Sequence, residues 1–385
     1  MEKILLGDAN FCVLPILKSI MSKNRQVSVV GGINTDPGHS VADVSVLMDY
    51  SDTDLLYKHI EEQKYDYIVP GCNDRSYLSL SEISQRTNRY YGLDDHNTVL
   101  TIHHKDKFKK FAQEQKYPVP KSVDKIEDVC NLKLPIIIKP IDSFSGKGVN
   151  IVNSTKDIYK YWSEAEKFSK TGLVIAEEFI EGDLYSHSAF IKNKNLLIDF
   201  FVNEYCTVYP FQVNSSNLSS NLSDLIMKGM REWVEQFARD LNLMDGLVHT
   251  QFIVNGDEFY ILEVARRCPG DLYSELISKS TGVDYAKLYS LPFLGQKLPD
   301  MIEKKFIKPI SRHTVSVDYE CIFISSKVNL KCSSVENIQL KYSGQKMKPA
   351  PFDKSGIYFI EHGSIDEMED KTKELRDYIE IQNIK

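Results

Sequence analysis

The chain has 385 residues, of which 42% are hydrophobic, so it is long enough for about two to four structural units. Its 47 Lys and Arg against 54 Asp and Glu give a formal net charge of −7, which argues against nucleic acid or an acidic membrane surface as the main partner. No apolar run approaches the roughly 20 residues that span a bilayer, so we expect no membrane partner either.

Cysteine usage and the first residues point to a cellular compartment. The seven cysteines are scattered and form no C-x-x-C pair, so neither structural zinc nor a disulfide framework is expected. Acidic residues interrupt the apolar start, MEKILLGDANFCVLPIL, which argues against a secretory signal. We therefore expect a cytoplasmic, mixed α/β protein with reduced thiols.

The first hundred residues alternate between β-type and helical patterns. Short apolar runs and helical spacing predict strands over residues 3–7, 27–30 and 67–70, and helices over residues 11–21, 54–63 and 77–85. This order predicts βαβ units and an open parallel sheet. Ligands of such domains lie beyond the carboxyl ends of the strands, which here carry residues 7–10, 31–32 and 71–74.

Residues 135–152, PIIIKPIDSFSGKGVNIV, predict a hairpin with a flexible loop suited to phosphate. The loop is made of the small and polar residues Ser143, Ser145, Gly146, Lys147 and Gly148. The glycines let backbone N–H groups approach an anion, and Lys139 and Lys147 supply positive charge. Neither a G-x-x-x-x-G-K-[ST] nor a G-x-G-x-x-G pattern is present, so an ordinary hairpin with a glycine turn is the alternative.

Further elements are predicted along the rest of the chain. They are helices over residues 105–114, 157–170, 224–241 and 367–379, and strands over residues 173–179, 185–191, 196–202, 314–318, 321–324 and 357–360. The polar stretch 214–223 is predicted to be a mobile loop. Aromatic residues before it either line a substrate pocket or pack in the core: Phe201, Tyr205, Tyr209 and Phe211.

A second hairpin, over residues 246–270, has polar side chains suited to a metal ion. The Asn255-Gly256-Asp257 turn predicts that Gln251 and Glu263 face each other on its two arms. Carboxylate and amide oxygens suit Mg²⁺, which also coordinates substrate phosphates. His249 shares the face of Gln251, and Arg267 could reach a phosphate or a carboxylate. An amphipathic hairpin with a solvated polar face is the alternative.

Between these hairpins, an apolar strand ends in Glu177-Glu178-Phe179-Ile180. Backbone groups at such a strand end can pair with the edge of an adenine, and a carboxylate can accept from its amine or from ribose. By itself this pattern is not specific. The pattern becomes informative because it lies between the predicted phosphate-binding loop and the predicted metal-binding hairpin.

In this order, the residues resemble the ATP-grasp superfamily over residues 1 to 295. The nearest branch is carbamoyl-phosphate-synthase-like and biotin-carboxylase-like, and it includes amino-acid ligases. The resemblance implies an α/β and α+β ATP-grasp fold with an N-terminal open parallel-sheet domain and a C-terminal mixed α/β extension. The implied divisions are residues 1–100, 101–190, 191–300 and 301–385. The second contains the loop of residues 143–148, called the glycine loop below, and the third contains the hairpin of residues 246–270, called the metal hairpin below.

The resemblance also implies roles for individual residues. ATP would be held by Lys105, Lys139, Ser143, Ser145, Gly146, Gly148, Glu177, Glu178, Phe179, Ile180 and Asp183. Mg²⁺ or Mn²⁺ would be held by Gln251 and Glu263, and the catalytic group would be Arg267, Lys147 and His249. His249 and Asp271 are the candidates for a general base, although a structural role for His249 is slightly favoured.

One departure from the family pattern stands in the metal hairpin. The family usually reads Glu-x-Asn-x-Arg, and this chain reads Glu263-Val264-Ala265-Arg266-Arg267. Ala265 cannot ligate, so water or another group such as His249 replaces the missing Asn, or one of two metals is lost. Arg266 is an unusual neighbour, and recognition of a substrate anion is one hypothesis for its role.

The expected function is that of an ATP-dependent carboxylate–amine ligase acting on small molecules. Its alternatives are a carboxylase-type enzyme that activates bicarbonate, and a nucleotide-binding protein that has lost turnover, which Ala265 would explain. The carboxylate and amine substrates cannot be read from the residues. Homodimers are common in the resembled branch, but no interface pattern is evident.

Overall fold

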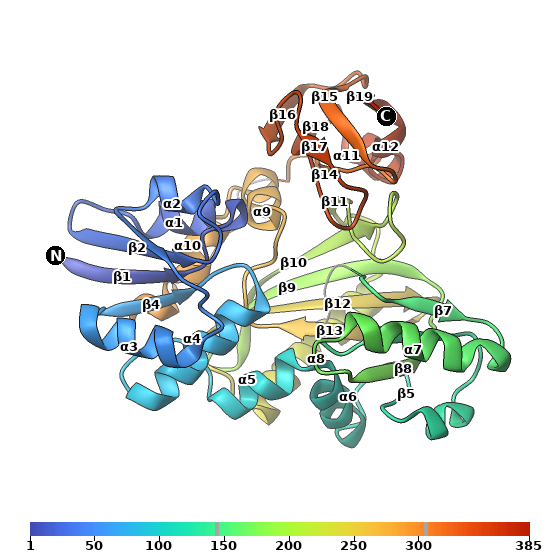
Figure 1. The fold of residues 1–385 in the computed structure, drawn as a ribbon, viewed down its shortest axis with the longest axis horizontal. Helices are drawn as coiled ribbons and strands as arrows, with labels where there is room; N and C mark the ends of the chain where they lie inside the picture. The colour runs from blue at the N-terminus through green and yellow to red at the C-terminus, as the bar shows by residue number, and fades with distance from the viewer. Residues whose placement is uncertain (143–145, 304–306) are drawn as a thin grey trace.

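A computed structural model describes residues 1–142, 146–303 and 307–385, and Figure 1 shows its ribbon. Within these residues the strands form four sheets of four, eight, three and four strands. The N-terminal sheet lies at one end of the molecule and a small sheet covered by α7 (Ile158–Phe168) at the other (Figure 1). Strands of the large sheet run between them, so this sheet links the parts that carry the predicted site.

The N-terminal sheet is open and parallel, in the order β3-β2-β1-β4, as the βαβ pattern predicts. Its part of the chain comprises β1 (Glu2–Gly7), η1 (Phe11–Val13), α1 (Leu14–Ile20), β2 (Arg25–Gly31), α2 (Gly38–Val41), β3 (Val44–Leu47), α3 (Thr53–Gln63), β4 (Tyr67–Pro70), α4 (Asp74–Thr87) and α5 (His96–His103). The six predicted elements are confirmed. Sequence reasoning missed the edge strand β3 and the helix α5, which leads into the next lobe.

The small sheet is antiparallel, in the order β5-β8-β6-β7. This lobe comprises α6 (Lys105–Glu114), β5 (Ser122–Val123), η2 (Ile126–Asn131), β6 (Ile136–Pro140), β7 (Asn150–Val152), η3 (Thr155–Asp157), α7 and β8 (Val174–Glu178). Ile136, Ile137 and Ile138 of β6 pair with Val152, Ile151 and Asn150 of β7, so the predicted hairpin is confirmed. The glycine loop connects these two strands.

The large sheet has the order β13-β12-β9-β10-β11-β14-β18-β16. Its first part and adjoining helices are β9 (Asp183–Lys192), β10 (Asn195–Tyr205), β11 (Ser215–Leu218), α8 (Asp224–Asp240), β12 (Gly246–Asn255), β13 (Glu258–Ala265), α9 (Tyr273–Thr281), α10 (Tyr285–Ser290) and η4 (Pro292–Leu294). Helix α8 packs its apolar side on one face of β9, β10 and β12. The opposite face of these strands carries the polar residues of the metal hairpin.

The prediction of a mobile loop over residues 214–223 is wrong for its first half. Residues 215–218 form the buried strand β11, which pairs with β10 on one side and β14 (Ile310–Val315) on the other. Its polar side chains are satisfied by distant partners, because Ser215 hydrogen-bonds His313 at 2.7 Å and Ser216 accepts from Arg312 at 2.9 Å. A strand can therefore be polar in sequence and still buried.

The C-terminal region continues the large sheet and adds a three-stranded sheet in the order β17-β15-β19. It comprises β14, β15 (Cys321–Val328), β16 (Ser334–Gln339), β17 (Lys346–Met347), β18 (Gly356–Glu361), α11 (Ile365–Thr372), α12 (Leu375–Tyr378) and β19 (Ile379–Ile384). The predicted single helix over residues 367–379 is wrong. The helix breaks into α11 and α12, and Ile379 begins a strand that pairs with β15.

The core of the N-terminal sheet is completed by residues far along the chain. Leu276, Tyr285 and Phe293 belong to the same buried cluster as Ile4 and Val29. Ser19 of α1 meets Ser290 of α10 at 3.1 Å between their hydroxyl oxygens. None of the helices within the described residues combines the length and apolarity that a bilayer crossing requires.

Candidate active site

A buried cluster of two lysines and one carboxylate lies where β8 meets the hairpin β6–β7 and the helix α6. Lys139 Nζ lies 2.8 Å from Glu177 Oε1, and Lys109 Nζ lies 3.4 Å from Glu177 Oε2. Burial would raise the pKa of Glu177, but the two lysines outweigh it and lower that pKa. Burial lowers the pKa of Lys109 to about 8 despite Glu177. The structure thus joins the predicted Lys139 and Glu177 in one ion cluster.

Lys109 is a residue that sequence reasoning missed. It lies one helical turn after Lys105 on α6, so the i, i+4 spacing could have placed both lysines on one face. Its ammonium group also donates to the carbonyl of Ile261 on β13 at 3.3 Å. Burial lowers the pKa of Lys105, while the Glu263 carboxylate opposes this effect. Helix α6 therefore directs positive charge toward the metal hairpin.

The end of β8 carries the predicted adenine-binding residues. The Glu178 carboxylate accepts from the Lys133 N–H at 3.0 Å, and the Phe179 N–H donates to the Pro135 carbonyl at 3.0 Å. These two groups therefore fix the strand end to the segment before β6. Asp183, at the start of β9, is exposed.

Two residues of the glycine loop contact aromatic side chains, Tyr209 and Phe352. Gly146 and Gly148 have φ values of 71° and 73°, a region that favours glycine. The Tyr209 hydroxyl donates to the Gly146 carbonyl at 2.9 Å, and Lys147 Nζ lies 4.8 Å from the ring centre of Phe352. Tyr209 thus contacts the phosphate-type loop. Ser143 and Ser145 lie outside the described residues.

The two predicted metal-binding residues face each other. Gln251 of β12 and Glu263 of β13 are direct cross-strand partners, as the central turn predicts. Ala265 is paired with His249 two residues along the ladder. Gln251 Nε2 also donates to Glu204 Oε2 of β10 at 2.6 Å, a contact that sequence reasoning missed. The two oxygen donors fit a hard cation such as Mg²⁺, whereas Ala265 offers none.

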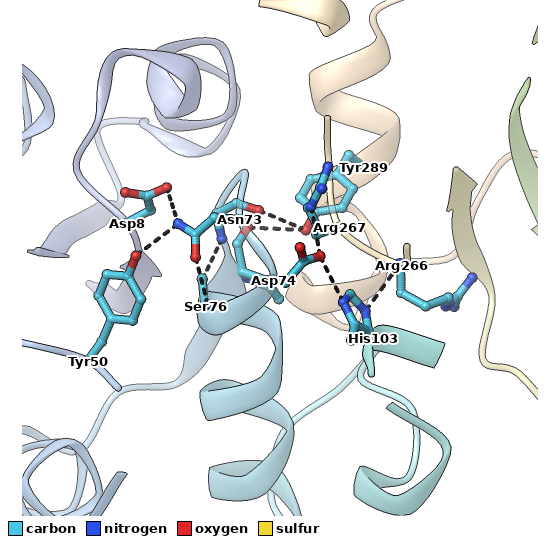
Figure 2. A network of polar contacts seen from close by, with 11 residues as sticks. Asp8, Tyr50, Asn73, Asp74, Ser76, His103, Arg266, Arg267 and Tyr289 are labelled. Atoms are coloured by element: carbon cyan, nitrogen blue, oxygen red, sulfur yellow. Dashed lines mark hydrogen bonds and ion pairs between the residues drawn. The ribbon is translucent and has the colours of Figure 1, made fainter. Parts of the chain in front are cut away.

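Arg267 follows β13 and is held by the N-terminal domain (Figure 2). Its Nε lies 3.0 Å from Asp74 Oδ1, at the first turn of α4, and His103 Nδ1 contacts the same oxygen at 2.9 Å. Desolvation would raise the pKa of Asp74, but Arg267 and His103 lower it well below its ordinary value. Asp74 therefore stays ionised and fixes the predicted phosphoryl-binding arginine.

Arg266 has a structural environment, so the idea that it recognises a substrate anion is wrong. It is 2% exposed, and its Nε lies 2.7 Å from Asp94 Oδ2. Its remaining nitrogens donate to the carbonyls of Leu247 at 2.6 Å and Met244 at 2.7 Å. Its backbone N–H donates to His103 Nε2 at 3.4 Å (Figure 2). A guanidinium satisfied in this way has little left to offer a ligand.

The two candidate bases lie in different settings. His249 is buried, its Nδ1 lies 2.9 Å from Ser188 Oγ, and burial lowers the pKa of His249 well below its ordinary value. Asp271 forms an ion pair with Lys354, and its backbone carbonyl accepts from Arg312 at 2.8 Å. Burial would raise the pKa of Asp271, but Lys354 and Arg312 lower it. The ring of His249 stays neutral and the Asp271 carboxyl stays ionised.

The carboxyl ends of β1 and β4 meet, as the parallel sheet predicts, around the side chain of Asp8 (Figure 2). Asp8 Oδ1 accepts from the N–H groups of Ala9 and Asn10 at 2.8 and 3.2 Å, and Oδ2 accepts from Asn73 at 2.7 Å. Asn73 also donates to the Tyr50 hydroxyl oxygen at 2.8 Å. These contacts order the loop that leads from β4 to Asp74, the first residue of α4.

Comparisons with known proteins show what the sequence and the fold are similar to. A model of the ATP-grasp domain matches residues 102–271. Formate-dependent phosphoribosylglycinamide formyltransferase of Prochlorococcus marinus is 24% identical over 77% of this chain and 76% of its own length. The carbamoyl phosphate synthase large chain of Synechocystis sp. is 24% identical over 55% of this chain, which spans only 20% of that protein.

The fold as a whole has a solved counterpart. L-amino acid ligase from Bacillus licheniformis superimposes with a TM-score of 0.79 at 18% identity, over 99% of this chain and 98% of that one. This likeness covers the N-terminal sheet, the glycine-loop lobe, the large sheet and the C-terminal region together. Residues 102–271 match an ATP-grasp domain, and the fold of the whole chain is similar to that of L-amino acid ligase.

Proposed function

We propose that the chain is an ATP-dependent ligase that activates a small-molecule carboxylate as an acyl phosphate and joins it to an amine, releasing ADP and phosphate. The observation that carries this proposal is the arrangement at β13. Glu263 faces Gln251 across the ladder, and Arg267 at the strand end is fixed by Asp74. The likeness to an ATP-grasp domain and, in fold, to an L-amino acid ligase supports the same reaction.

The chemistry explains why these residues are needed. A carboxylate carbon is a poor electrophile, and transfer of the γ-phosphoryl group of ATP to a carboxylate oxygen gives it a good leaving group. The amine then attacks the carbonyl carbon, and phosphate leaves with the electron pair of the broken C–O bond. Catalysis of such a transfer consists mainly of positioning and charge stabilisation. Arg267 and Lys147 are the residues to which we assign the transferred phosphoryl group.

Nucleotide binding is assigned to the glycine-loop lobe. Lys105 and Lys139 would contact phosphate oxygens, and Gly146 and Gly148 would let the loop backbone approach them. Because the Phe179 N–H is already bonded to Pro135, we assign the adenine edge to the adjacent Ile180. A closed loop would exclude water and protect the acyl phosphate from hydrolysis.

Gln251 and Glu263 would hold Mg²⁺ or Mn²⁺ through their side-chain oxygens. When bound, the metal ion neutralises charge that develops on the phosphates. Ala265 removes one donor from the usual set, which makes a nucleotide-binding protein without turnover the second candidate function.

The test is phosphate release from ATP and Mg²⁺, screened over pools of carboxylates and amines. We expect turnover that requires one carboxylate and one amine, with an amino acid as the first choice of carboxylate. Glu263→Gln, which keeps the side-chain shape, should abolish it, whereas the exposed Glu232→Gln should not. Tight ATP binding without turnover in any pool would contradict the ligase and favour the binding protein.

The cellular setting is part of the proposal. All seven cysteines lie within the described residues as unpaired thiols, which supports a reducing compartment and hence the cytoplasm. We expect small-molecule substrates as partners. Sedimentation of the intact chain would decide between a monomer and a homodimer.

A further inference from the structure

The Gln251 side chain lies between two carboxylates in the large sheet. In the strand order β13-β12-β9-β10, Glu263 is its partner on β13, and Glu204 reaches it from β10 across β9. Gln251 Nε2 donates to Glu204 Oε2 at 2.6 Å. Glu204 is only 5% exposed, and it also interacts with the Ser186 hydroxyl of β9. Glu204 is thus fixed between two polar partners.

This contact determines which way round the Gln251 amide group lies. A side-chain amide presents two N–H donors on one side and an acceptor oxygen on the other, and rotation by 180° exchanges them. Because Glu204 Oε2 accepts from Gln251 Nε2, Glu204 holds the NH₂ group toward β10. The Gln251 carbonyl oxygen is then turned away from β10, toward Glu263. This orientation offers oxygen rather than nitrogen to a cation beside Glu263.

We propose that Glu204 is a positioning residue that orients the Gln251 amide so that its oxygen serves as the second protein ligand of the metal ion. This inference rests on the metal site of the proposed function. The need for it arises from Ala265, which leaves the hairpin with one carboxylate and one amide as its donors. With so few donors, an amide that rotated would leave Glu263 as the only ligand from the hairpin.

Glu204 acts through Gln251 rather than on the metal ion. One of its oxygens accepts from the Gln251 amide, and its buried carboxylate interacts with Ser186. Burial raises the pKa of Glu204 and the Glu263 carboxylate adds to this effect, whereas Ser186, Arg312 and Gln251 only partly oppose it. Partners of this kind, which hold a ligand without touching the metal, typically change metal affinity about 10- to 100-fold when they are altered.

The test compares Mn²⁺ binding in the presence of ADP, measured by electron paramagnetic resonance, in four variants of the full chain. Glu204→Gln can donate as well as accept, so it no longer fixes the amide, and we expect Mn²⁺ binding about 10- to 100-fold weaker. Gln251→Glu alone places two carboxylates against each other, which repel. The double variant Glu204→Gln/Gln251→Glu restores a donor–acceptor pair and should bind Mn²⁺ at least as tightly as the unaltered chain. Glu232→Gln on the exposed side of α8 is the matched control.

Each outcome decides between the hypotheses. Weak binding in Glu204→Gln supports the positioning role when the double variant restores it and also binds Mn²⁺ more tightly than Gln251→Glu alone, because an added carboxylate ligand by itself would strengthen both variants that carry it. Equal binding in Glu204→Gln and the unaltered chain overturns it, and so does a double variant as weak as Glu204→Gln. If the unaltered chain binds ADP but no Mn²⁺, the metal site of the proposed function fails instead. Thermal unfolding of each variant shows whether the sheet is intact.

Discussion

Two adjacent arginines tie the end of β13 to the N-terminal domain in contrasting ways. Arg266 and Asp94 form a buried pair in which both side chains are 1% exposed. Arg267 and Asp74 form a pair whose side chains are 17% and 45% exposed. Arg266 also donates to two backbone carbonyls, whereas within the described residues Arg267 makes one hydrogen bond, through Nε. We refer to these as the Asp94 pair and the Asp74 pair.

This difference predicts a structural role for the charge of Arg266 and a ligand-binding role for the charge of Arg267. The donors of Arg266 are used up by the protein, so its positive charge serves to join two parts of the chain. Arg267 is fixed through a single nitrogen, Nε, so within the described residues its other nitrogens make no hydrogen bond and could donate to a ligand. We therefore expect these two identical side chains in adjacent positions to have different roles, because their partners differ.

The largest effect on activity is expected from Arg267→Lys. The variant keeps the charge but loses the planar donor geometry, so we expect turnover to fall by about 10³-fold or more, as for other arginines that stabilise a transferred phosphoryl group. Phosphate release measures it, and the midpoint of thermal unfolding should change little. Turnover within about tenfold of the unaltered chain would contradict this role.

The largest effect on stability is expected from Arg266→Met. Removing one partner leaves Asp94 buried without its counter-charge, so we expect the free energy of unfolding to fall by roughly 3–5 kcal/mol in denaturant titrations. Replacing both partners in Arg266→Met/Asp94→Leu should cost less, because no buried charge then remains. If Arg266→Met unfolds like the unaltered chain, the contrast between the two pairs is wrong.

A smaller effect is expected from Asp74→Asn, which weakens the hold on Arg267. Misplacement of this group should lower kcat by about 10- to 100-fold while the KM for ATP stays nearly constant. The exposed Asp54→Asn on α3 serves as the matched control. A change confined to KM would show that Asp74 takes part in ATP binding and does not position Arg267.

The smallest effect concerns the loss of stability at acid pH. We expect the buried His313, and not the Asp74 pair, to contribute to it between about pH 6.5 and 5. Burial and nearby arginines lower the pKa of His313 to about 3, against about 6.5 in an unfolded chain. Between these values the unfolded chain binds the extra proton, so the free energy of unfolding falls by up to about 1.4 kcal/mol for each unit that pH drops. His313→Gln should flatten this slope in denaturant titrations between pH 6.5 and 5. Asp74→Asn should leave it unchanged, because a carboxylate with a lowered pKa loses its contribution only at lower pH.

Sequence reasoning succeeds where a local pattern fixes geometry. The turn over residues 255–257 sets which residues of its arms are opposite, so the pairing of Gln251 with Glu263 could be predicted from the residues alone. The hairpin β6–β7 and the helix α6 follow for the same reason, since their patterns are short-range. The assigned roles of these residues stay predictions until they are measured.

Sequence reasoning fails where partners come from distant segments. Asp74 and Arg267 are 193 positions apart, and nothing local marks either as a partner of the other. Strand β11 reads as a loop because Ser215 and Ser216 are polar, and only His313 and Arg312, nearly a hundred residues later, make burial tolerable. The contact of Glu204 with Gln251 likewise depends on the sheet order, in which β9 lies between β10 and β12.

The return of α9 and α10 to the N-terminal sheet has a consequence for biosynthesis. The core that contains Ile4 also contains Tyr285 and Phe293, so its apolar surface stays incomplete until those residues have left the ribosome. The first hundred residues are therefore synthesised early, but their core is completed only after α9 and α10 have been synthesised. A nascent chain of this protein would expose its first strands for most of translation, so we expect chaperones to bind them.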